Sequence, residues 1–159
     1  MLMIRKVVNY ETKHLEQIVN NLRNLEKIQL DKIKTDLMAW NEMILKDTPY
    51  PKTGLADGRP VAIGGISRLW DGVGEGWLIG SQDFKSHMFF ICKHVRKYIK
   101  EYTKIMSINR LQAVVSASNK DVYRFAEKFA GFTYEGYLHS YGMDGTDQLM
   151  FARWGLKDG

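Results

Sequence analysis

The stretch Asn119-Lys-Asp-Val-Tyr-Arg-Phe-Ala-Glu-Lys-Phe-Ala-Gly131-Phe132 decides the fold of this chain, because an apolar segment precedes it and another follows it. Leu111 to Ser116 is apolar and β-branched, which predicts a buried strand. Asn119 is placed to cap a helix whose apolar residues recur at helical spacing. Gly131 is placed to end that helix in a left-handed conformation. The predicted order is therefore strand, short helix, Gly-Phe, strand.

The composition indicates one folded domain. The chain has 159 residues, of which 45% are hydrophobic and 26% are charged. A domain of this size can bury roughly 70% of its unfolded surface. We therefore expect residues 1–159 to form a single domain. The formal net charge of +5 favours an anionic partner, which could be nucleic acid, an acidic protein or a phosphorylated cofactor.

Cysteine usage and hydropathy exclude several classes. Cys92 is the only cysteine, so no intramolecular disulfide can form, and the spacing of Cys and His fits no four-ligand zinc site. We expect no metal. No signal-length apolar run opens the chain, and no later window holds about 18 consecutive apolar residues. These features favour a reducing, cytoplasmic location and no membrane partner.

The segments upstream predict a strand and two helices. Met3 to Val8 is apolar-rich and is compatible with a first strand. Apolar residues then recur at helical spacing from Leu15 to Ile44, with a shift of phase near residues 26–29, which predicts two helices and a bend. Thr12 is placed to cap the first helix.

Prolines and Asp-Gly pairs delimit the later elements. Pro49 and Pro51 end the helical region. Asp57-Gly58 and Asp144-Gly145 are typical of hairpin turns. Strands are expected over residues 54–56 and 61–66, on either side of the first turn, and over residues 133–140 and 148–154, on either side of the second. A further strand is expected over residues 72–80, followed by a long helix over residues 84–102.

This order of elements resembles the GCN5-related N-acetyltransferase (GNAT) family, in which an Asn begins the last helix and Gly-Phe precedes the last two strands. The resemblance spans nearly the whole chain. It implies an α/β (α+β) fold with a mixed, splayed central sheet flanked by helices, and transfer of an acetyl group from acetyl-CoA to an amine of a protein or small molecule. A second resemblance, through Trp77-Leu-Ile-Gly80 and the helix after it, is to short GNAT-like proteins of tailed bacteriophages, which would place the protein in the host cytoplasm or the virion.

The resemblance also implies where acetyl-CoA binds. In the family it lies in the split between the fourth and fifth strands, here Glu75–Gly80 and Leu111–Ser116, with its pyrophosphate on the next helix start. The family loop Gln/Arg-x-x-Gly-x-Gly/Ala corresponds to Ser81–Met88, which lacks the glycines and contains Asp83, a charge that would repel phosphate. The expected cofactor-binding residues are Leu78, Ile79, Gln82, Lys85, Ser86, His87 and Asn119.

Catalysis requires a base, because an exposed amine is protonated near pH 7. Family bases often sit on the fourth strand, so Glu75 is the predicted base, against a role as an ordinary strand residue. The family's proton donor to the CoA thiolate is a Tyr seven residues beyond the Asn, where this chain has Ala126. Tyr123, one helical turn earlier, is the predicted substitute. The helix is also one residue longer before Gly131 than in the family pattern, so Tyr123 can substitute only if the helix geometry shifts. Residues expected to line the acceptor side are Trp77, His139 and Tyr141.

Two alternatives to an enzyme stay open. The departures from the family pattern at the pyrophosphate loop and at Ala126 fit a catalytically silent GNAT fold used for binding or as a virion component. The basic face from Lys93 to Lys104 is either a solvated surface or a phosphate-binding patch, and a nucleic-acid-binding protein would use it. Binding of acetyl-CoA or of duplex DNA separates these classes.

Overall fold

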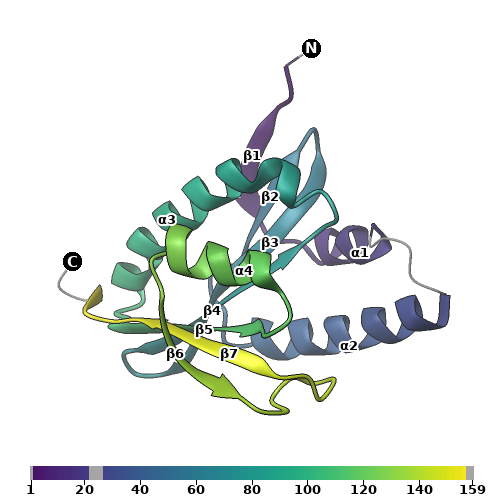
Figure 1. The fold of residues 1–159 in the computed structure, drawn as a ribbon. Helices are drawn as coiled ribbons and strands as arrows, with labels where there is room; N and C mark the ends of the chain where they lie inside the picture. The colour runs from purple at the N-terminus through teal and green to yellow at the C-terminus, as the bar shows by residue number, and fades with distance from the viewer. Residues whose placement is uncertain (1, 22–26, 157–159) are drawn as a thin grey trace. The chain divides into compact units, whose positions relative to one another are not determined.

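The computed structural model of the chain describes residues 2–21 and 27–156. Its elements follow the order drawn in Figure 1. The strands are β1 (Arg5–Asn9), β2 (Lys52–Ala56), β3 (Arg59–Trp70), β4 (Val73–Gly80), β5 (Arg110–Ser116), β6 (Thr133–Leu138) and β7 (Gln148–Arg153). The helical elements are α1 (Thr12–Asn20), α2 (Lys27–Leu45), the 3₁₀ turn η1 (Lys85–His87), α3 (Met88–Ile105), α4 (Lys120–Arg124) and the π-helical turn η2 (Phe125–Phe129).

The strands form a mixed sheet in the order β1-β2-β3-β4-β5-β7-β6. β4 and β5 run parallel, whereas the β1–β2, β2–β3, β5–β7 and β6–β7 pairs are antiparallel. Helices connect β1 to β2, β4 to β5 and β5 to β6. The predicted α/β fold with a mixed central sheet is confirmed.

The chain divides into two compact units. The first comprises Met1–Ser67 and Leu78–Ile91, and the second comprises Arg68–Trp77 and Cys92–Gly159. β3, β4 and α3 each contribute residues to both units. The expectation of a single domain over residues 1–159 stays a prediction.

Buried contacts of α1 organise the first unit. His14 is 4% exposed, and its Nδ1 accepts a hydrogen bond from the Glu11 N–H at 3.0 Å and lies 2.8 Å from the Thr53 hydroxyl on β2. This arrangement caps the helix at Glu11, with Thr12 as the first helical residue. The prediction that Thr12 is the cap was wrong, because a histidine three residues beyond Glu11 supplies the capping bond.

The helical region before β2 consists of two helices, as predicted. α1 ends at Asn20 and α2 begins at Lys27. Residues 22–26 lie outside the described residues, and the predicted shift of phase falls partly on them. Within the described ranges, no helix is both long enough and apolar enough to cross a bilayer.

β7 forms the centre of the second unit. It pairs with β5 from Leu111–Arg153 to Ser116–Gln148 and with β6 on its other edge. Its residues Phe151 and Ala152 are 0% exposed, as is Leu111 beside it. The pairing therefore fixes which side chains of all three strands share a face, because successive residues of a strand alternate between faces.

The predicted helix after Asn119 is not uniform. α4 runs from Lys120 to Arg124 and passes into the π-helical turn, in which the Ala130 N–H donates to the Phe125 carbonyl at 3.0 Å. A π turn holds one residue more than an α turn. Gly131 then follows with φ 72°, which confirms the predicted left-handed end. The wide turn accommodates the extra residue before Gly131 that the family resemblance indicated.

A β-bulge re-aims the side chains of β6. The register between β6 and β7 shifts between Tyr134 and Gly136, which leaves Glu135 as the extra residue. Glu135 accepts two hydrogen bonds from the Arg110 guanidinium, at 2.9 and 2.6 Å. Such a bidentate pair is the strong form of a salt bridge. It holds the bulge in place from the far side of β7.

We predict that His14 makes the stability of the protein depend on pH. Burial lowers the pKa of His14, so the folded state binds its proton less readily than the unfolded state does. Its contribution is therefore complete above the ordinary histidine pKa of about 6.5 and is lost as pH falls through the lower folded value. His14→Gln should reduce the free energy of unfolding at pH 8 by about 1–3 kcal/mol and weaken its loss on acidification.

Urea unfolding from pH 8 to pH 5 measures both effects. His139→Gln is the control, because that histidine is largely exposed. If the wild type and His14→Gln lost equal free energy of unfolding between pH 8 and pH 5, the prediction would be contradicted.

Candidate active site

The loop after β4, in the first unit, uses its own backbone donors. The Asp83 N–H donates to the Ser81 hydroxyl and the Phe84 N–H to the Ser81 carbonyl, both at 3.1 Å. The Ser86 and His87 N–H groups donate at 3.1 Å to the carbonyls of Asp83 and Phe84. These four donors are therefore not offered to a pyrophosphate in this conformation. A phosphate here would depend on side chains or on a rearranged loop.

The side chains of the loop are tied to the end of α1. Gln82 Nε2 donates to Asn21 Oδ1 at 2.6 Å, and Asn21 Nδ2 donates to Asp83 Oδ2 at 3.3 Å. The predicted phosphate ligand Gln82 is thus already bonded. The hydrogen bond that Asp83 accepts from Asn21 comes from a neutral amide.

The other predicted loop ligands differ in exposure. Lys85 and Ser86 are exposed, as a phosphate-binding role requires. His87 is only 7% exposed, and its Nδ1 accepts a hydrogen bond from Arg5 Nε at 2.9 Å. Burial and the Arg5 charge lower the pKa of His87. His87 is therefore buried with its Nδ1 occupied, and its predicted contact with phosphate stays a prediction.

The parallel pairing of β4 with β5, in the second unit, is short. It joins Val73–Glu75 to Arg110–Gln112 and ends there, while β5 continues to Ser116. The rest of β5 lies outside this ladder, as a splayed sheet requires. That edge can pair with an extended ligand in the manner of an added strand.

The predicted base, Glu75, sits at the end of this ladder. It is half-buried and lies beside Gln112 of β5. Burial raises the pKa of Glu75, and a hydrogen bond with the Gln112 side chain partly offsets that rise. A carboxyl group with a raised pKa is better matched to proton transfer near neutral pH than an ordinary one.

Glu75 and Tyr123 lie on opposite faces of the sheet. Glu75 shares a face with Gln112, and the next residue of β5, Ala113, points to the other face. Ala113 pairs with Phe151, whose ring contacts the ring of Tyr123 edge-on with centroids 5.2 Å apart. The predicted base and the predicted acid therefore do not form one cluster.

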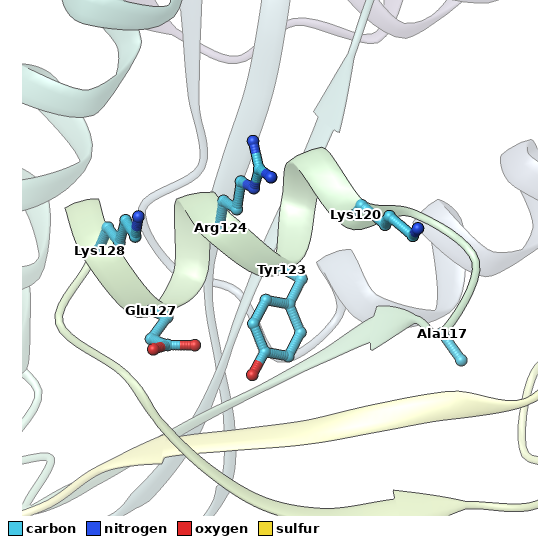
Figure 2. A pocket seen from close by; sticks show the side chains of 6 residues that line it. All are labelled: Ala117, Lys120, Tyr123, Arg124, Glu127 and Lys128. Carbon is cyan, nitrogen blue, oxygen red and sulfur yellow. The ribbon is translucent and has the colours of Figure 1, made fainter.

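An open hollow of about 440 Å³ lies beside α4. Figure 2 shows Tyr123 and Glu127 pointing from the helix toward the strands. A hydrogen bond to Glu127 raises the pKa of Tyr123, so its phenol stays protonated at neutral pH. The hollow combines a phenol, a carboxylate and three cations, and its lining residues are Ala117, Lys120, Tyr123, Arg124, Glu127 and Lys128.

Asn119 lies at the start of α4, where its carbonyl accepts the Tyr123 N–H at 3.1 Å. The predicted position of Asn119 at the helix start is thus confirmed. Its predicted role toward acetyl-CoA stays a prediction. Leu78 and Ile79, on the last residues of β4, likewise remain predicted cofactor contacts.

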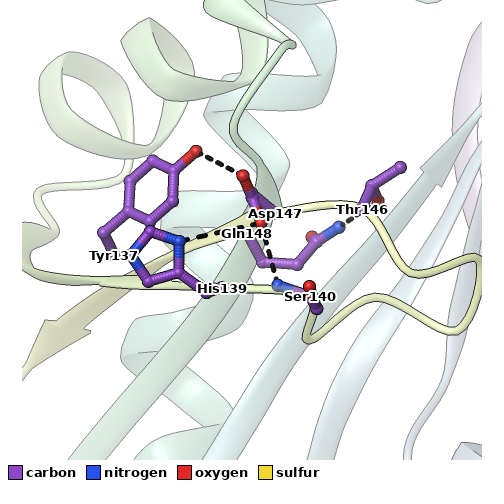
Figure 3. A network of polar contacts seen from close by, with 6 residues as sticks. All are labelled: Tyr137, His139, Ser140, Thr146, Asp147 and Gln148. Carbon is purple, nitrogen blue, oxygen red and sulfur yellow. Dashed lines mark hydrogen bonds and ion pairs between the residues drawn. The ribbon is translucent and has the colours of Figure 1, made fainter.

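A polar network joins the ends of β6 and β7 (Figure 3). The Tyr137 hydroxyl donates to Asp147 Oδ2 and the Ser140 N–H donates to Asp147 Oδ1, both at 2.8 Å. These two bonds lower the pKa of Asp147. The His139 ring stacks on Tyr137 with centroids 4.7 Å apart, and its Nδ1 lies 4.0 Å from Asp147 Oδ1.

The residues predicted to line the acceptor side are not gathered in one place. Trp77 is 7% exposed and follows Glu75 by two residues, so it shares the Glu75 face. His139 belongs to the network of Figure 3 and stacks on Tyr137, which pairs with Leu149 on the face of Phe151 and Tyr123. Tyr141 is 59% exposed on the connection to β7.

Comparison with known proteins identifies the fold. No family model matches the chain, and no curated protein matches it in sequence. Among solved structures, Ard1 from Thermoplasma volcanium matches with a TM-score of 0.69 at 12% identity, over 94% of this chain and 97% of its own. A spermidine N-acetyltransferase SpeG chimera from Vibrio cholerae and hSSAT matches with a TM-score of 0.68 at 14% identity, over 96% of each chain.

A third solved structure is an α-N-protein acetyltransferase of ribosomal L7/L12, RimL, in complex with coenzyme A. It matches with a TM-score of 0.69 at 12% identity, over 97% of this chain and 96% of its own. At such identities the likeness shows the fold alone, and the predicted GNAT-like fold is confirmed.

The sequence prediction missed the side chains around Tyr123. Glu127 lies four residues beyond Tyr123, and Lys120, Arg124 and Lys128 repeat at the same interval. That interval places side chains on one stripe of a helix and was the available signal. Asp147 was also missed, because only the pairing of β6 with β7 brings it to Tyr137. Within the described part of the chain no cluster suited to a metal ion exists.

We predict that Gly80 is required by the ring of Phe84. A Cβ added at Gly80 would lie 2.6 Å from Cδ2 and 2.9 Å from Cγ of that ring. Gly80→Ala should therefore reduce the free energy of unfolding by about 1–3 kcal/mol, as overpacking does. Thermal or urea unfolding measures this loss.

The double variant Gly80→Ala/Phe84→Ala supplies the control. Phe84→Ala removes the clash, so the double variant should be more stable than the sum of the two single changes predicts. If the double variant lost as much free energy of unfolding as the two single variants together, the predicted clash would be contradicted.

We predict that Glu75→Gln stabilises the protein increasingly as pH rises. A raised folded pKa means that the contribution of Glu75 is complete below its unfolded value and is lost as pH rises through the folded value. Gln keeps the size and hydrogen bonding but removes the charge that burial penalises. Between pH 4 and pH 9, the free energy of unfolding of Glu75→Gln should rise relative to that of the wild type. A difference that stays constant with pH would contradict the prediction. Glu42→Gln, on an exposed residue, is the control.

Proposed function

We propose that this chain is an N-acetyltransferase that moves the acetyl group of acetyl-CoA to an amine of a protein or small molecule. The observation that carries the proposal is Tyr123, a protonated phenol in an open hollow, on a fold that matches the SpeG chimera over 96% and RimL over 97% of this chain. We place the reaction in the cytoplasm, of a bacterial host if a phage encodes the chain.

Tyr123 would serve the leaving group. Attack of the amine forms the N–C bond and breaks the C–S bond, and the CoA thiolate then requires a proton. A phenol that is protonated at neutral pH can donate it. Glu127 holds that phenol in place through their hydrogen bond. Tyr123 thereby takes the role that the family resemblance leaves vacant at Ala126.

The cations of the hollow support a phosphorylated cofactor. Lys120, Arg124 and Lys128 are exposed residues that line it. Arg and Lys bind phosphate by charge-assisted hydrogen bonds. The pantetheine arm would pair with the edge of β5 beyond Gln112. Lys85 and Ser86 of the first unit remain proposed phosphate ligands.

One observation favours a second function. The N–H groups of Asp83, Phe84, Ser86 and His87 are bonded within their own loop. A fold that lost catalysis and serves as a binding or virion protein would tolerate such a closed loop. Calorimetry with acetyl-CoA and with duplex DNA separates the functions, because the enzyme binds the first, a nucleic-acid-binding protein binds the second, and the silent fold binds neither.

Arg124→Glu tests the hollow as the cofactor site. Replacing a cation that contacts phosphate by an anion should weaken acetyl-CoA binding at least about tenfold at low salt. Lys46→Glu, with the same change of charge on an exposed residue, is the control. Equal dissociation constants for the two variants would place the phosphates elsewhere.

Tyr123→Phe tests the chemistry. With spermidine and an alanine-initiated peptide as acceptors, since the neighbouring structures include a spermidine and a ribosomal-protein-alanine acetyltransferase, release of CoA thiol should fall about 10²-fold or more. Acetyl-CoA affinity should stay near that of the wild type. Tyr50→Phe is the control, and unchanged turnover in Tyr123→Phe would remove the phenol from the mechanism.

A further inference from the structure

The bulge in β6 brings three side chains onto the face of Tyr123. Tyr134 pairs with Phe151 and Tyr137 pairs with Leu149, two residues earlier on β7. Phe151 and Leu149 share a face, so Tyr134 and Tyr137 share it too, although residues three apart in a regular strand point to opposite faces. His139, two residues beyond Tyr137, continues on that face and stacks on its ring.

Asp147 connects His139 with the rim of the hollow. The residue after it, Gln148, pairs with Leu138 of β6 and with Ser116 of β5. The Asp147 carbonyl accepts the Ala117 N–H at 3.1 Å, and Ala117 lines the hollow. The Asp147 side chain accepts the N–H of Ser140, the residue after His139.

Asp147 lies beside the imidazole of His139. Both of its oxygens accept hydrogen bonds at 2.8 Å, from Tyr137 and from Ser140. The Ser140 bond holds a residue with φ 53°, a conformation that costs a non-glycine residue energy. Nδ1 of His139 faces this carboxylate at 4.0 Å, and the side chain is 83% exposed. A proton on Nδ1 would face this carboxylate, and the Nε2 lone pair would then be open to solvent.

We propose that His139, oriented by Asp147, is the base that takes the proton from the acceptor amine. This inference rests on the proposed acetyl transfer and assigns its base to the face of Tyr123, whereas Glu75 lies on the opposite face. The order of carboxylate, imidazole and Nε2 is that of a general base, with the carboxylate 4.0 Å from Nδ1. Imidazole is also the side chain that titrates nearest to neutral pH, where a base is most effective.

The proton balance closes with these groups. Nε2 of His139 takes one proton from the ammonium form of the acceptor and releases it to solvent. The neutral amine attacks the thioester carbon, so the N–C bond forms and the C–S bond breaks. Tyr123 gives its proton to the departing thiolate, and the second amine proton, lost as the amide forms, restores the phenol. The products are the acetylated amine, CoA thiol and one proton.

Two titratable side chains of the described residues face His139. Tyr137 of β6 stacks on it, and Asp147 at the start of β7 faces Nδ1. Asp144 of the same connection binds the N–H and hydroxyl of Thr146. Asp144→Asn is therefore a matched control for Asp147→Asn.

The first experiment measures the tautomer directly and requires no acceptor. Nitrogen-15 chemical shifts of the uncharged His139 ring should show its proton on Nδ1. Asp147→Asn should move the population of this ring toward the Nε2–H form. Asp144→Asn should leave it unchanged. A wild-type ring with its proton on Nε2 overturns the proposal by itself.

The second experiment follows turnover with the acceptors used for Tyr123→Phe. His139→Gln should lower kcat about 10²-fold with little change in acetyl-CoA affinity, and the rise of kcat/KM with pH below neutrality should flatten. His94→Gln, on α3, is the control. Normal turnover in His139→Gln together with loss in Glu75→Gln would assign the base to β4 and overturn this inference while the proposed function stands. Failure of the wild type to bind acetyl-CoA would instead overturn the proposed function.

Discussion

The pairing of β7 with β5 on one edge and β6 on the other is the constraint on which the candidate site depends. It buries Phe151 completely and sets the rows of side chains across three strands. Tyr123 rests on Phe151, so the position of α4 follows from the same pairing. A slip of one residue in β7 would send Phe151, Leu149 and Asp147 to the other face. The hollow and the polar network would then separate.

Two local irregularities adapt this framework. The π-helical turn after α4 absorbs an additional residue before Gly131, and the bulge at Glu135 turns Tyr137 toward the helix. Each interrupts a regular hydrogen-bond ladder and is compensated nearby, in the bulge by the Arg110–Glu135 pair. Such irregularities occur frequently at functional sites. Here both direct side chains to the same face of the sheet.

The two units contribute different properties. In the first, the loop after β4 is closed by its own hydrogen bonds and by Asn21, which is a stable arrangement for a loop without the family's glycines. In the second, a phenol and a carboxylate line a hollow beside α4, and an exposed imidazole belongs to the polar network at the ends of β6 and β7. The proposed chemistry therefore rests on residues of the second unit, and the proposed binding of phosphate near the first unit has less support.

The sequence by itself determined the elements and their order. Helical spacing of apolar residues, Asp-Gly at the turns and Gly131 after the last helix are local signals, because they act through backbone conformation and short-range periodicity. They predicted the mixed α/β fold and placed Tyr123 on a helix. The cap of α1 was missed, since the Glu11–His14 bond replaces the usual Ser or Thr cap. Asn119 at the helix start was predicted because its signal is local.

The tertiary structure decided which of these residues meet. Glu75 and Tyr123 were each predicted to be catalytic, and strand alternation with the register of β5 and β7 places them on opposite faces. His87 was predicted to face phosphate, yet Arg5, 82 positions earlier, takes its Nδ1. Asp147 reaches Tyr137 only through the pairing of β6 with β7. Register and contacts between distant segments are set by the burial of whole faces, and a list of residues in order does not contain that information.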